Sequence, residues 1–251
     1  MNASVVLSSA ASKRLIARGV AAHPKVHQAM SEGRVVITRG TTNAFVAEEL
    51  LGEPIDRAAF AAGFIDDRWN LNARFREMTD ILLEKGRRID AEPEAVVQRL
   101  QAGDVVIKGG NALDPWGTVG VLLASASGGT VGTYIPAAVA RGADLVIPIS
   151  VSKSVHASVA DLSLEMGSGR TEPHQGLSCG LFPLHGWIVT EIEALDLLFG
   201  VESLHIASGG VGPGRGSVSL LLRGEAKPIQ NALAAISAWH DEQDVELVGH
   251  A

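Results

Sequence analysis

Residues 104–120, DVVIKGGNALDPWGTVG, decide how the rest of the chain is understood. The stretch opens with a short apolar run, residues 104–108, of the kind that forms a buried strand. Gly109 and Gly110 follow, and glycines allow a backbone to approach a ligand closely. Lys108 is the only cation among these glycines and polar side chains. A buried strand that ends in such a bend predicts a pocket for a small phosphorylated or carboxylated molecule.

A second unit of the same design lies earlier in the chain. Residues 34–38 are a β-branched run, Gly40-Thr-Thr-Asn43 is a turn, and residues 44–51 have helical composition that ends at Gly52. A helix that begins directly after a strand leaves several backbone N–H groups open to an anion. The alternative is a plain capped helix start, since Thr and Asn are good caps.

The order of these units predicts the fold class. Apolar runs alternate with helical segments through the first 150 residues, with strands at 34–38, 104–108, 117–124 and 144–149 and helices at 8–31, 44–51, 93–101 and 132–141. Continuous apolar strands that alternate with helices are typical of a parallel sheet. We therefore expect an α/β fold with a mostly parallel sheet and helices on both faces.

The composition changes after Ser150. Residues 152–176 are rich in Ser, Gly and His and predict a linker or active-site loop between a ligand-binding domain, residues 1–151, and a C-terminal part, residues 177–251. That part has the order strand, helix, two strands, helix and a last strand at 245–248. This order predicts a ferredoxin-like α+β subdomain.

Composition excludes some classes of function. The net charge of −7 argues against binding to nucleic acid or to an anionic membrane. No apolar run reaches the ~18 residues of a membrane helix. Cys179 is the only cysteine, so no disulfide within the chain is possible, and we expect a cytoplasmic protein. The basic N-terminus is compatible with a targeting segment or, as we prefer, a folded helix.

The candidate binding residues surround these bends. Gly40, Thr41, Thr42 and Asn43 are expected to hold an anionic group together with Gly109 and Gly110. A second anion nest is expected at Gly128, Gly129 and Thr130, where the alternative is a loop that starts a helix. Lys153 lies just past the fourth strand, where a catalytic group could enter.

The candidate catalytic residues are Lys108, Asn111 and Asp114. Lys108 could pair with substrate charge, or it could be an exposed lysine at a strand end. Asn111 and Asp114 could orient hydroxyl groups, but Asn and Asp-Pro-Trp-Gly are also ordinary turn residues. Isomerisation requires a general base, for which Asp114 and Glu48 are candidates.

No metal and no cofactor is expected, because the histidines show no metal-ligand spacing. The glycine-rich segment 209–216 lies between two predicted strands, where a nucleotide loop would precede a helix. It is better explained as a flexible hairpin, either a lid or a subunit contact, and a homo-oligomer is expected.

Two motifs carry a resemblance to a known superfamily. Arg39-Gly-Thr-Thr-Asn-Ala44 resembles the phosphate loop of the ribose-5-phosphate isomerase and glucosamine-6-phosphate deaminase fold, which also includes CoA transferases and the initiation factor 2B and methylthioribose-1-phosphate isomerase group. Residues 106–114 are similar to the Gly-Ala-Asp block of that last group and to the Lys-Gly-Gly-Gly-Gly-Ala-Leu segment of ribose-5-phosphate isomerase. The resemblance implies an enzyme of sugar-phosphate isomerase or transferase-like type.

The chain also departs from those motifs. Asn111 stands where the isomerase group has a catalytic aspartate, and an amide cannot act as a general base. No cysteine lies near residues 128–133. These departures support a second hypothesis, a non-catalytic metabolite sensor with the same pocket. A third hypothesis is a homo-oligomeric assembly module.

Overall fold

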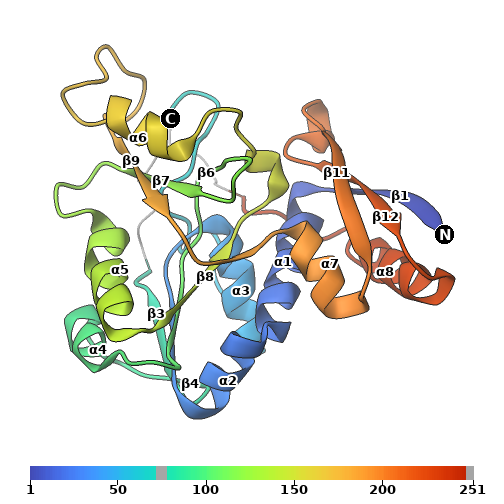
Figure 1. The fold of residues 1–251 in the computed structure, drawn as a ribbon, viewed down its shortest axis with the longest axis horizontal. Helices are drawn as coiled ribbons and strands as arrows, with labels where there is room; N and C mark the ends of the chain where they lie inside the picture. Colours follow the sequence, from blue (N-terminus) through green and yellow to red (C-terminus); the bar gives the residue numbers. More distant parts are fainter. Residues whose placement is uncertain (72–77, 247–251) are drawn as a thin grey trace.

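A six-stranded sheet forms the centre of the molecule. The computed structural model describes residues 1–71 and 78–246 (Figure 1). Four neighbouring strands of this sheet are parallel, and two further strands extend it in antiparallel orientation. In order across the sheet they are β10 (Trp187–Val189), β8 (Asp144–Pro148), β5 (Val105–Ile107), β2 (Arg34–Ile37), β3 (Ile81–Glu84) and β4 (Arg87–Arg88).

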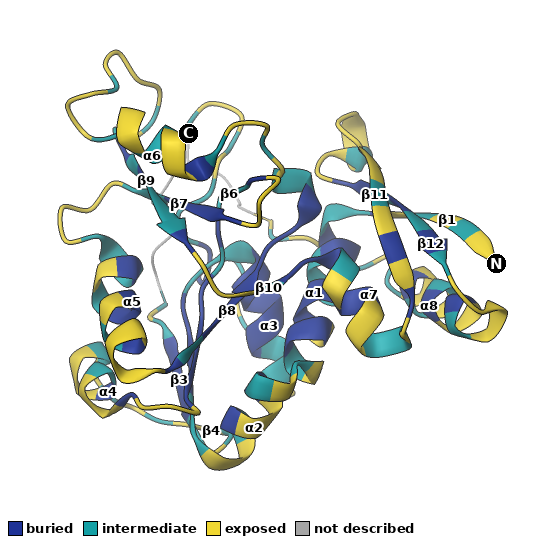
Figure 2. Cartoon of the chain, viewed as in Figure 1, coloured by how far each residue is buried: buried dark blue, intermediate teal, exposed yellow. Residues whose placement is uncertain are grey.

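Both faces of the central sheet are covered, because successive strand residues point to opposite sides. Val35 and Ile37 of β2 belong to one hydrophobic core, and Val36 belongs to the other. The first core also contains residues of α1 (Ser9–Ala22), α2 (Pro24–Glu32) and α3 (Thr41–Leu51). The second contains residues of α4 (Pro93–Arg99) and α5 (Gly129–Arg141). Strands β8, β5, β2 and β3 are mostly buried between the two cores (Figure 2).

Two smaller antiparallel sheets flank the centre. One consists of β1 (Asn2–Leu7), β12 (Val218–Arg223) and β11 (Glu202–Ser208), with α7 (Glu191–Phe199) and α8 (Ala226–Ala238) beside it (Figure 1). The other consists of β6 (Ala112–Leu113), β7 (Val119–Leu123) and β9 (Gly180–Leu184). Short helices η1 (Val151–Lys153), α6 (Val159–Glu165) and η2 (Gly212–Gly214) complete the described elements.

The mixed α/β class is confirmed, but one predicted strand lies elsewhere. Residues 117–124 were expected in the parallel sheet, and the structure places β7 in the antiparallel sheet with β6 and β9. The physical reason is the turn between β6 and β7. The carboxylate of Asp114 accepts hydrogen bonds from the N–H groups of Trp116 and Thr118, which folds the chain back on itself as a hairpin.

The C-terminal strands also differ from the predicted ferredoxin-like unit, because they are divided among three sheets. β9 pairs with β7, β10 extends the parallel sheet beside β8, and only β11 and β12 pair with each other. β1, from the other end of the chain, pairs with β12 over six residues and takes the place of the missing partner. The predicted last strand at 245–248 lies partly outside the described residues, and residues 245 and 246 form no strand.

Helix starts are earlier than predicted at two functionally interesting places. Thr41, Thr42 and Asn43 form the first turn of α3, and Gly129 and Thr130 form the first turn of α5. Both helices have glycine at the N-cap, and neither cap makes a side-chain hydrogen bond. The sequence patterns hid these starts because hydroxyl, amide and glycine residues resemble a loop before the apolar part of the helix begins.

Candidate functional site

A cavity of about 370 Å³ opens at the carboxyl edge of the parallel strands, and we call it the main cavity because both predicted bends line it. This is the edge at which open α/β sheets usually bind ligands. Its wall combines the first turn of α3, the Gly109–Gly110 bend after β5, and Ser150, Ser152 and Lys153 after β8. The start of α1 and the C-terminal residues Asp244 and Val245 close the other side. The structure thus places the two bends quoted from the sequence at one cavity.

The first turn of α3 forms an open polar surface on this cavity. Gly40, Thr41, Thr42 and Asn43 all line it, and the N-cap residue is Gly40, which has no side chain to cap the helix. The N–H groups of a first turn have no partner within the helix and carry its positive dipole end. An anionic group of a ligand is the natural partner for them.

Asn43 adds a buried acceptor that has no partner. Its Nδ2 donates to the carbonyl oxygen of Thr38 at 2.7 Å, which fixes the side chain against β2. Its Oδ1 is buried and accepts no hydrogen bond from the described residues. A Cβ built on Gly109 would lie 3.7 Å from this oxygen, so the bare backbone of Gly109 leaves space beside it. A buried acceptor without a donor costs about 1–3 kcal/mol, and a ligand hydroxyl could remove that cost.

Three cations border the cavity, and two of them have carboxylate partners. Lys13 Nζ lies 2.5 Å from Asp244, and Arg39 Nε lies 3.4 Å from Asp80. Lys153 Nζ donates to the carbonyl oxygen of Gly110 at 2.7 Å. Within residues 1–71 and 78–246, no carboxylate is close enough to form an ion pair with Lys153.

The environment of Lys153 disfavours its charged form. Its side chain is only half-buried because it borders the cavity, yet the surrounding protein replaces most of the nearby water. This desolvation, together with the positive charges of Lys13 and Lys108, lowers the pKa of Lys153 to about 8 against an opposing effect of Glu191.

Lys108 lies behind the bend rather than in the cavity wall. The residue is buried, and its Nζ donates to the carbonyl oxygen of Gly109 at 3.0 Å. Desolvation lowers the pKa of Lys108 to about 8, and the negative charge of Asp80 opposes that shift only in part. The structure therefore positions Lys108 to support the backbone that faces the ligand.

Asn111 lines the cavity, but its amide is already used. Nδ2 donates to the carbonyl oxygen of Gly63 at 2.8 Å, and Oδ1 accepts from the N–H of Leu122 at 3.0 Å. These two bonds tie the bend to the loop and to β7. The placement favours a structural role for this side chain at the rim of the site.

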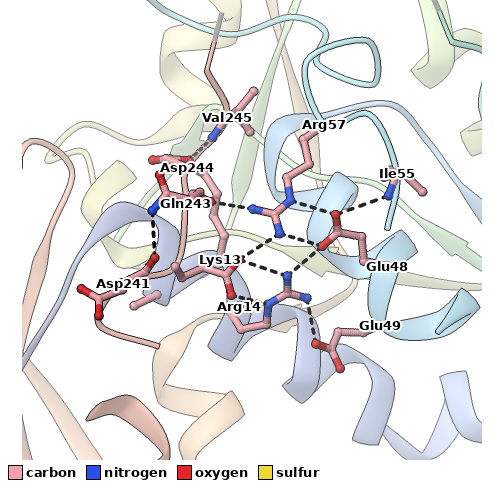
Figure 3. Close-up of polar contacts among 12 residues, drawn as sticks. Lys13, Arg14, Glu48, Glu49, Ile55, Arg57, Asp241, Gln243, Asp244 and Val245 are labelled. Atoms are coloured by element: carbon pink, nitrogen blue, oxygen red, sulfur yellow. Dashed lines mark hydrogen bonds and ion pairs between the residues drawn. The ribbon is translucent and has the colours of Figure 1, made fainter. Parts of the chain in front are cut away.

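Asp114 and Glu48, the two candidates for a general base, do not line this cavity. Burial raises the pKa of Asp114, but hydrogen bonds from Thr118, Val159 and Trp116 outweigh it and hold the pKa below its ordinary value. The carboxylate of Glu48 binds the guanidinium groups of Arg14 and Arg57 (Figure 3). Each carboxylate is thus engaged in holding the fold together.

The sequence did not reveal a buried carboxylate that stands behind the cavity. Glu191 is wholly buried, and its Oε1 accepts hydrogen bonds from the hydroxyl groups of Ser12 and Ser150, while its Oε2 accepts from the N–H of Val151 at 2.9 Å. Ser12 and Ser150 line the cavity. The capping box at Thr190 marked the helix start but gave no sign that Glu191 points inward.

Close packing of two helices brings Glu191 to this position. A Cβ on Gly19 of α1 would lie 2.5 Å from the Cβ of Ala194 in α7, so only glycine permits this approach. The contact places Ser12, two turns earlier in α1, against Glu191 at the start of α7. No local sequence pattern could reveal the pairing, because the two residues are 179 positions apart.

Gly128, Gly129 and Thr130 line a second, smaller cavity of about 100 Å³. Arg39, Ala62 and Gly63 border both cavities, so the two are neighbours across a short loop. The predicted second nest therefore lies beside the main cavity and not within it.

Other candidate chemistries find little support in the structure. Among the described residues, no group of three or more His, Cys, Asp or Glu side chains could hold a metal ion. Cys179 is buried, and burial raises the pKa of its thiol, which disfavours the reactive thiolate. Within the same part of the chain, none of the helices has both the length and the apolar composition that a membrane crossing requires.

A comparison with known proteins finds no matching family model, no matching curated protein and no matching solved structure. The function therefore has to be argued from the cavity and its side chains.

Proposed function

We propose that the chain is a small-molecule enzyme of sugar-phosphate isomerase or transferase-like type, which acts on a phosphorylated or carboxylated metabolite in the main cavity. One observation carries the proposal. The uncapped first turn of α3 lines the cavity and includes Asn43, whose buried Oδ1 has no partner among the described residues and lies beside the bare backbone of Gly109. Together they present donors for an anion and an acceptor for a hydroxyl group.

The anionic end of such a ligand would lie at the first turn of α3. Arg39 and Lys13 border the same space, and their carboxylate partners keep the cavity close to neutral until a ligand arrives. Charge-assisted hydrogen bonds to backbone N–H groups and to a guanidinium are worth about 1.5–3 kcal/mol each. This end supplies affinity.

The hydroxylated end would lie between Asn43 and the serines after β8. Asn43 Oδ1 accepts, whereas Ser150 and Ser152 can both donate and accept. A site that is built to hydrogen-bond hydroxyl groups rejects analogues that lack them, because its buried polar groups are then left unpaired. This end supplies selectivity for polyhydroxylated compounds over simple anions.

Proton transfer requires a group that changes its charge near neutral pH. Lys153 meets this requirement, because its pKa is lowered to about 8 and its Nζ lies at the bend that faces the ligand. Glu191 and Ser150 form a second route by which a proton could leave the cavity. No cofactor is needed for chemistry of this kind.

The superfamily resemblance supports this choice of chemistry through the motifs at residues 39–44 and 106–114. A cytoplasmic location rests on the single buried cysteine.

The antiparallel sheet of β1, β12 and β11 is the part that we propose for self-assembly. Its edge strand β11 exposes Leu204 and Ile206. Light scattering that gives the mass of one chain would contradict the homo-oligomer.

A metabolite sensor with the same pocket is the second candidate, and a specific observation favours it. Asn111 replaces the catalytic aspartate of the isomerase group, and its amide is committed to Gly63 and Leu122. Exchange of ligand protons with deuterated solvent separates the two functions. Exchange catalysed by the protein supports the enzyme, whereas a tightly bound ligand that exchanges no faster than in buffer supports the sensor.

Binding itself is tested by thermal unfolding against a panel of sugar phosphates and sugar acids. We expect at least one compound to raise the midpoint by several degrees at millimolar concentration, and the simple sugar and inorganic phosphate to raise it less. A panel that shifts nothing contradicts both the enzyme and the sensor.

A further inference from the structure

We infer that Lys153 is a nucleophile that forms an imine with its ligand, so the substrate is an open-chain aldehyde or ketone that carries the anionic group. This inference rests on the proposed function, because it assigns chemistry to the same cavity. Its geometric basis is the position of Lys153 Nζ, which is held at the Gly109–Gly110 bend inside a cavity that can take such a ligand.

Lys153 is set apart from the other lysine of the cavity wall by its partners. Lys13 Nζ is held by the carboxylate of Asp244 at 2.5 Å and also donates to the hydroxyl of Ser9 at 2.8 Å. Lys153 Nζ donates to one backbone carbonyl oxygen, 2.7 Å away. A neutral amine that gives one hydrogen bond to a carbonyl keeps its lone pair free for attack on carbon.

The surrounding charges favour the neutral amine. Lys13 on α1 and Lys108 at the end of β5 both disfavour a third positive charge, while Glu191 on α7 acts in the opposite direction and Asp244 is already paired with Lys13. With a pKa of about 8, roughly a tenth of Lys153 is neutral at pH 7. A lysine with the ordinary value of 10.5 would be neutral in only about 0.03% of molecules.

The serines on the same segment as Lys153 can handle the protons and the water that imine formation requires. Nζ attacks the carbonyl carbon, a C–N bond forms as one C–O bond of the carbonyl group breaks, and a proton moves from the nitrogen to the oxygen to give a carbinolamine. The nitrogen lone pair then forms the C=N bond while hydroxide leaves and is protonated to water. Ser150 and Ser152 line the cavity, and the carboxylate of Glu191 behind Ser150 can accept and return the proton.

The remaining groups fit the rest of such a ligand. The first turn of α3 would hold the phosphate or carboxylate, and Asn43 Oδ1 would accept from a hydroxyl group. Once the iminium has formed, its positive charge makes the neighbouring C–H bond more acidic, and the route through Ser150 and Glu191, in place of Lys153, takes up the released proton. That consequence joins imine formation to the isomerase-type chemistry proposed above.

Reductive trapping tests the inference. The full chain is incubated with dihydroxyacetone phosphate or ribose 5-phosphate and sodium cyanoborohydride, digested, and mapped by mass spectrometry. Hydride from the reagent reduces the iminium to a stable secondary amine. We expect the adduct on Lys153 at least ten times more abundantly than on the exposed Lys227, and no adduct from glycerol 3-phosphate, which has no carbonyl group.

A matched pair of variants accompanies the wild type. Lys153→Arg keeps the positive charge and should abolish the adduct while the affinity for the phosphate-bearing probe changes less than fivefold, and Lys227→Arg should change neither. The trapping rate of the wild type should rise at least tenfold from pH 6 to pH 8 and then level off. Because the mapping uses the wild type, it remains decisive even if Lys153→Arg fails to fold.

The outcomes separate this inference from the proposed function. If calorimetry shows that the probe binds but no adduct forms on Lys153, or if the trapping rate keeps climbing to pH 10, the imine is overturned and the proposed function stands. If calorimetry detects no binding by any phosphorylated or carboxylated carbonyl compound of the panel, the proposed function and the imine are overturned together.

Discussion

Two polar clusters lie on neighbouring parts of the molecule and use their charges in opposite ways. The arginine cluster consists of Arg14, Arg57, Glu48, Glu49 and Glu242, and it ties α1 and α3 to the C-terminal segment (Figure 3). The main cavity is bordered by other residues of the same two helices and of the same segment. The arginine cluster pairs its charges with one another, whereas the main cavity has hydrogen-bond donors and an acceptor without partners among the described residues.

The arginine cluster is nearly complete in itself. Arg14 and Arg57 each contact Glu48 and Glu242, and both guanidinium groups stack over the ring of Phe45, at 5.0 Å and 3.9 Å from its centroid. Burial raises the pKa of Glu48, but hydrogen bonds from Arg57 and Arg14 outweigh it and lower the pKa overall. Such a network is a structural clasp, because each of its charged groups already has a partner of opposite sign.

In the main cavity, by contrast, several polar groups have no partner. Asn43 Oδ1 lacks a donor, Lys153 lacks a carboxylate, and α3 lacks a cap among the described residues. Each of these features costs stability unless something binds there. The comparison teaches that charged residues alone do not mark a site in this chain, and that unsatisfied polar groups beside an open volume do.

The largest expected effect comes from breaking the arginine cluster. Glu48→Ala should lower the free energy of unfolding by about 2–4 kcal/mol, because it removes one of the two carboxylates that Arg14 and Arg57 share. Urea unfolding at pH 7 measures this. As a control, Glu202→Ala removes an exposed pair with Arg223 and should cost less than about 1 kcal/mol. Equal effects of the two changes would contradict the clasp.

The cluster also predicts the response of the fold to acid. The pKa values of Glu48 and Glu242 are lowered in the folded chain, so their contribution is fully present above their ordinary value of 4.5. It is lost as the pH falls through the lowered values. The stability difference between wild type and Glu48→Ala should therefore shrink below pH 4.5 in urea titrations.

The next effect has the opposite sign and concerns the lysine behind the cavity. Lys108→Met should raise the free energy of unfolding at pH 7 by about 1–3 kcal/mol, because the buried ammonium forms no ion pair with any described residue and pays for desolvation. The gain should fade as the pH rises from about 8 to 10.5, where the unfolded chain alone still holds the proton. A destabilised variant at pH 7 would show that Lys108 stabilises the bend.

The two glycines of the bend offer a sharper test, because they should separate folding from binding. A Cβ on Gly110 would lie 2.1 Å from Val119 Cγ1, so Gly110→Ala should cost about 1–3 kcal/mol of stability. A Cβ on Gly109 meets nothing closer than 3.5 Å. Gly109→Ala should fold normally by urea unfolding and weaken ligand binding by about 1–2 kcal/mol, because its methyl group fills the space beside Asn43 Oδ1 that a ligand hydroxyl would need. Unaltered binding by Gly109→Ala would remove Asn43 from the site.

The smallest effect concerns Asp244, an acidic residue that borders the cavity and holds Lys13. Asp244→Asn releases Lys13 and removes a negative charge, so an anionic ligand should bind more tightly by about 0.3–1 kcal/mol at low salt. Isothermal titration calorimetry at two salt concentrations checks this, and the gain should fall as salt increases. Tighter binding that does not depend on salt would contradict an electrostatic cause.

Local patterns in the sequence predicted much of what forms the cavity. The runs at residues 34–38 and 104–108 became neighbouring parallel strands, and the polar bends that follow them face one another. These signals are local, because periodicity and glycine position act within a few residues. The parallel pairing of these two strands then brings the bends that follow them to the same edge of the sheet.

The features of the fold and of the site that the sequence did not predict depend on contacts between distant parts of the chain. β1 and β12 are separated by more than 200 residues, so no pattern in residues 177–251 could reveal that a strand from the N-terminus would complete that sheet. Glu191 carries no local mark of its inward position, and the lowered pKa of Lys153 comes from desolvation in the folded chain and from the charges of Lys13 and Lys108. Burial and neighbouring charges are properties of the assembled fold.

Titration calorimetry of ribose 5-phosphate against the wild type and Gly109→Ala, beside ribose and inorganic phosphate, tests the central claim most directly. We expect the sugar phosphate to bind more tightly than either of its parts, and Gly109→Ala to lose about 1–2 kcal/mol of this affinity without loss of stability. Ribose 5-phosphate binding that is no tighter than phosphate binding, or that is the same in both proteins, would contradict a cavity that joins an anion site to a hydroxyl acceptor.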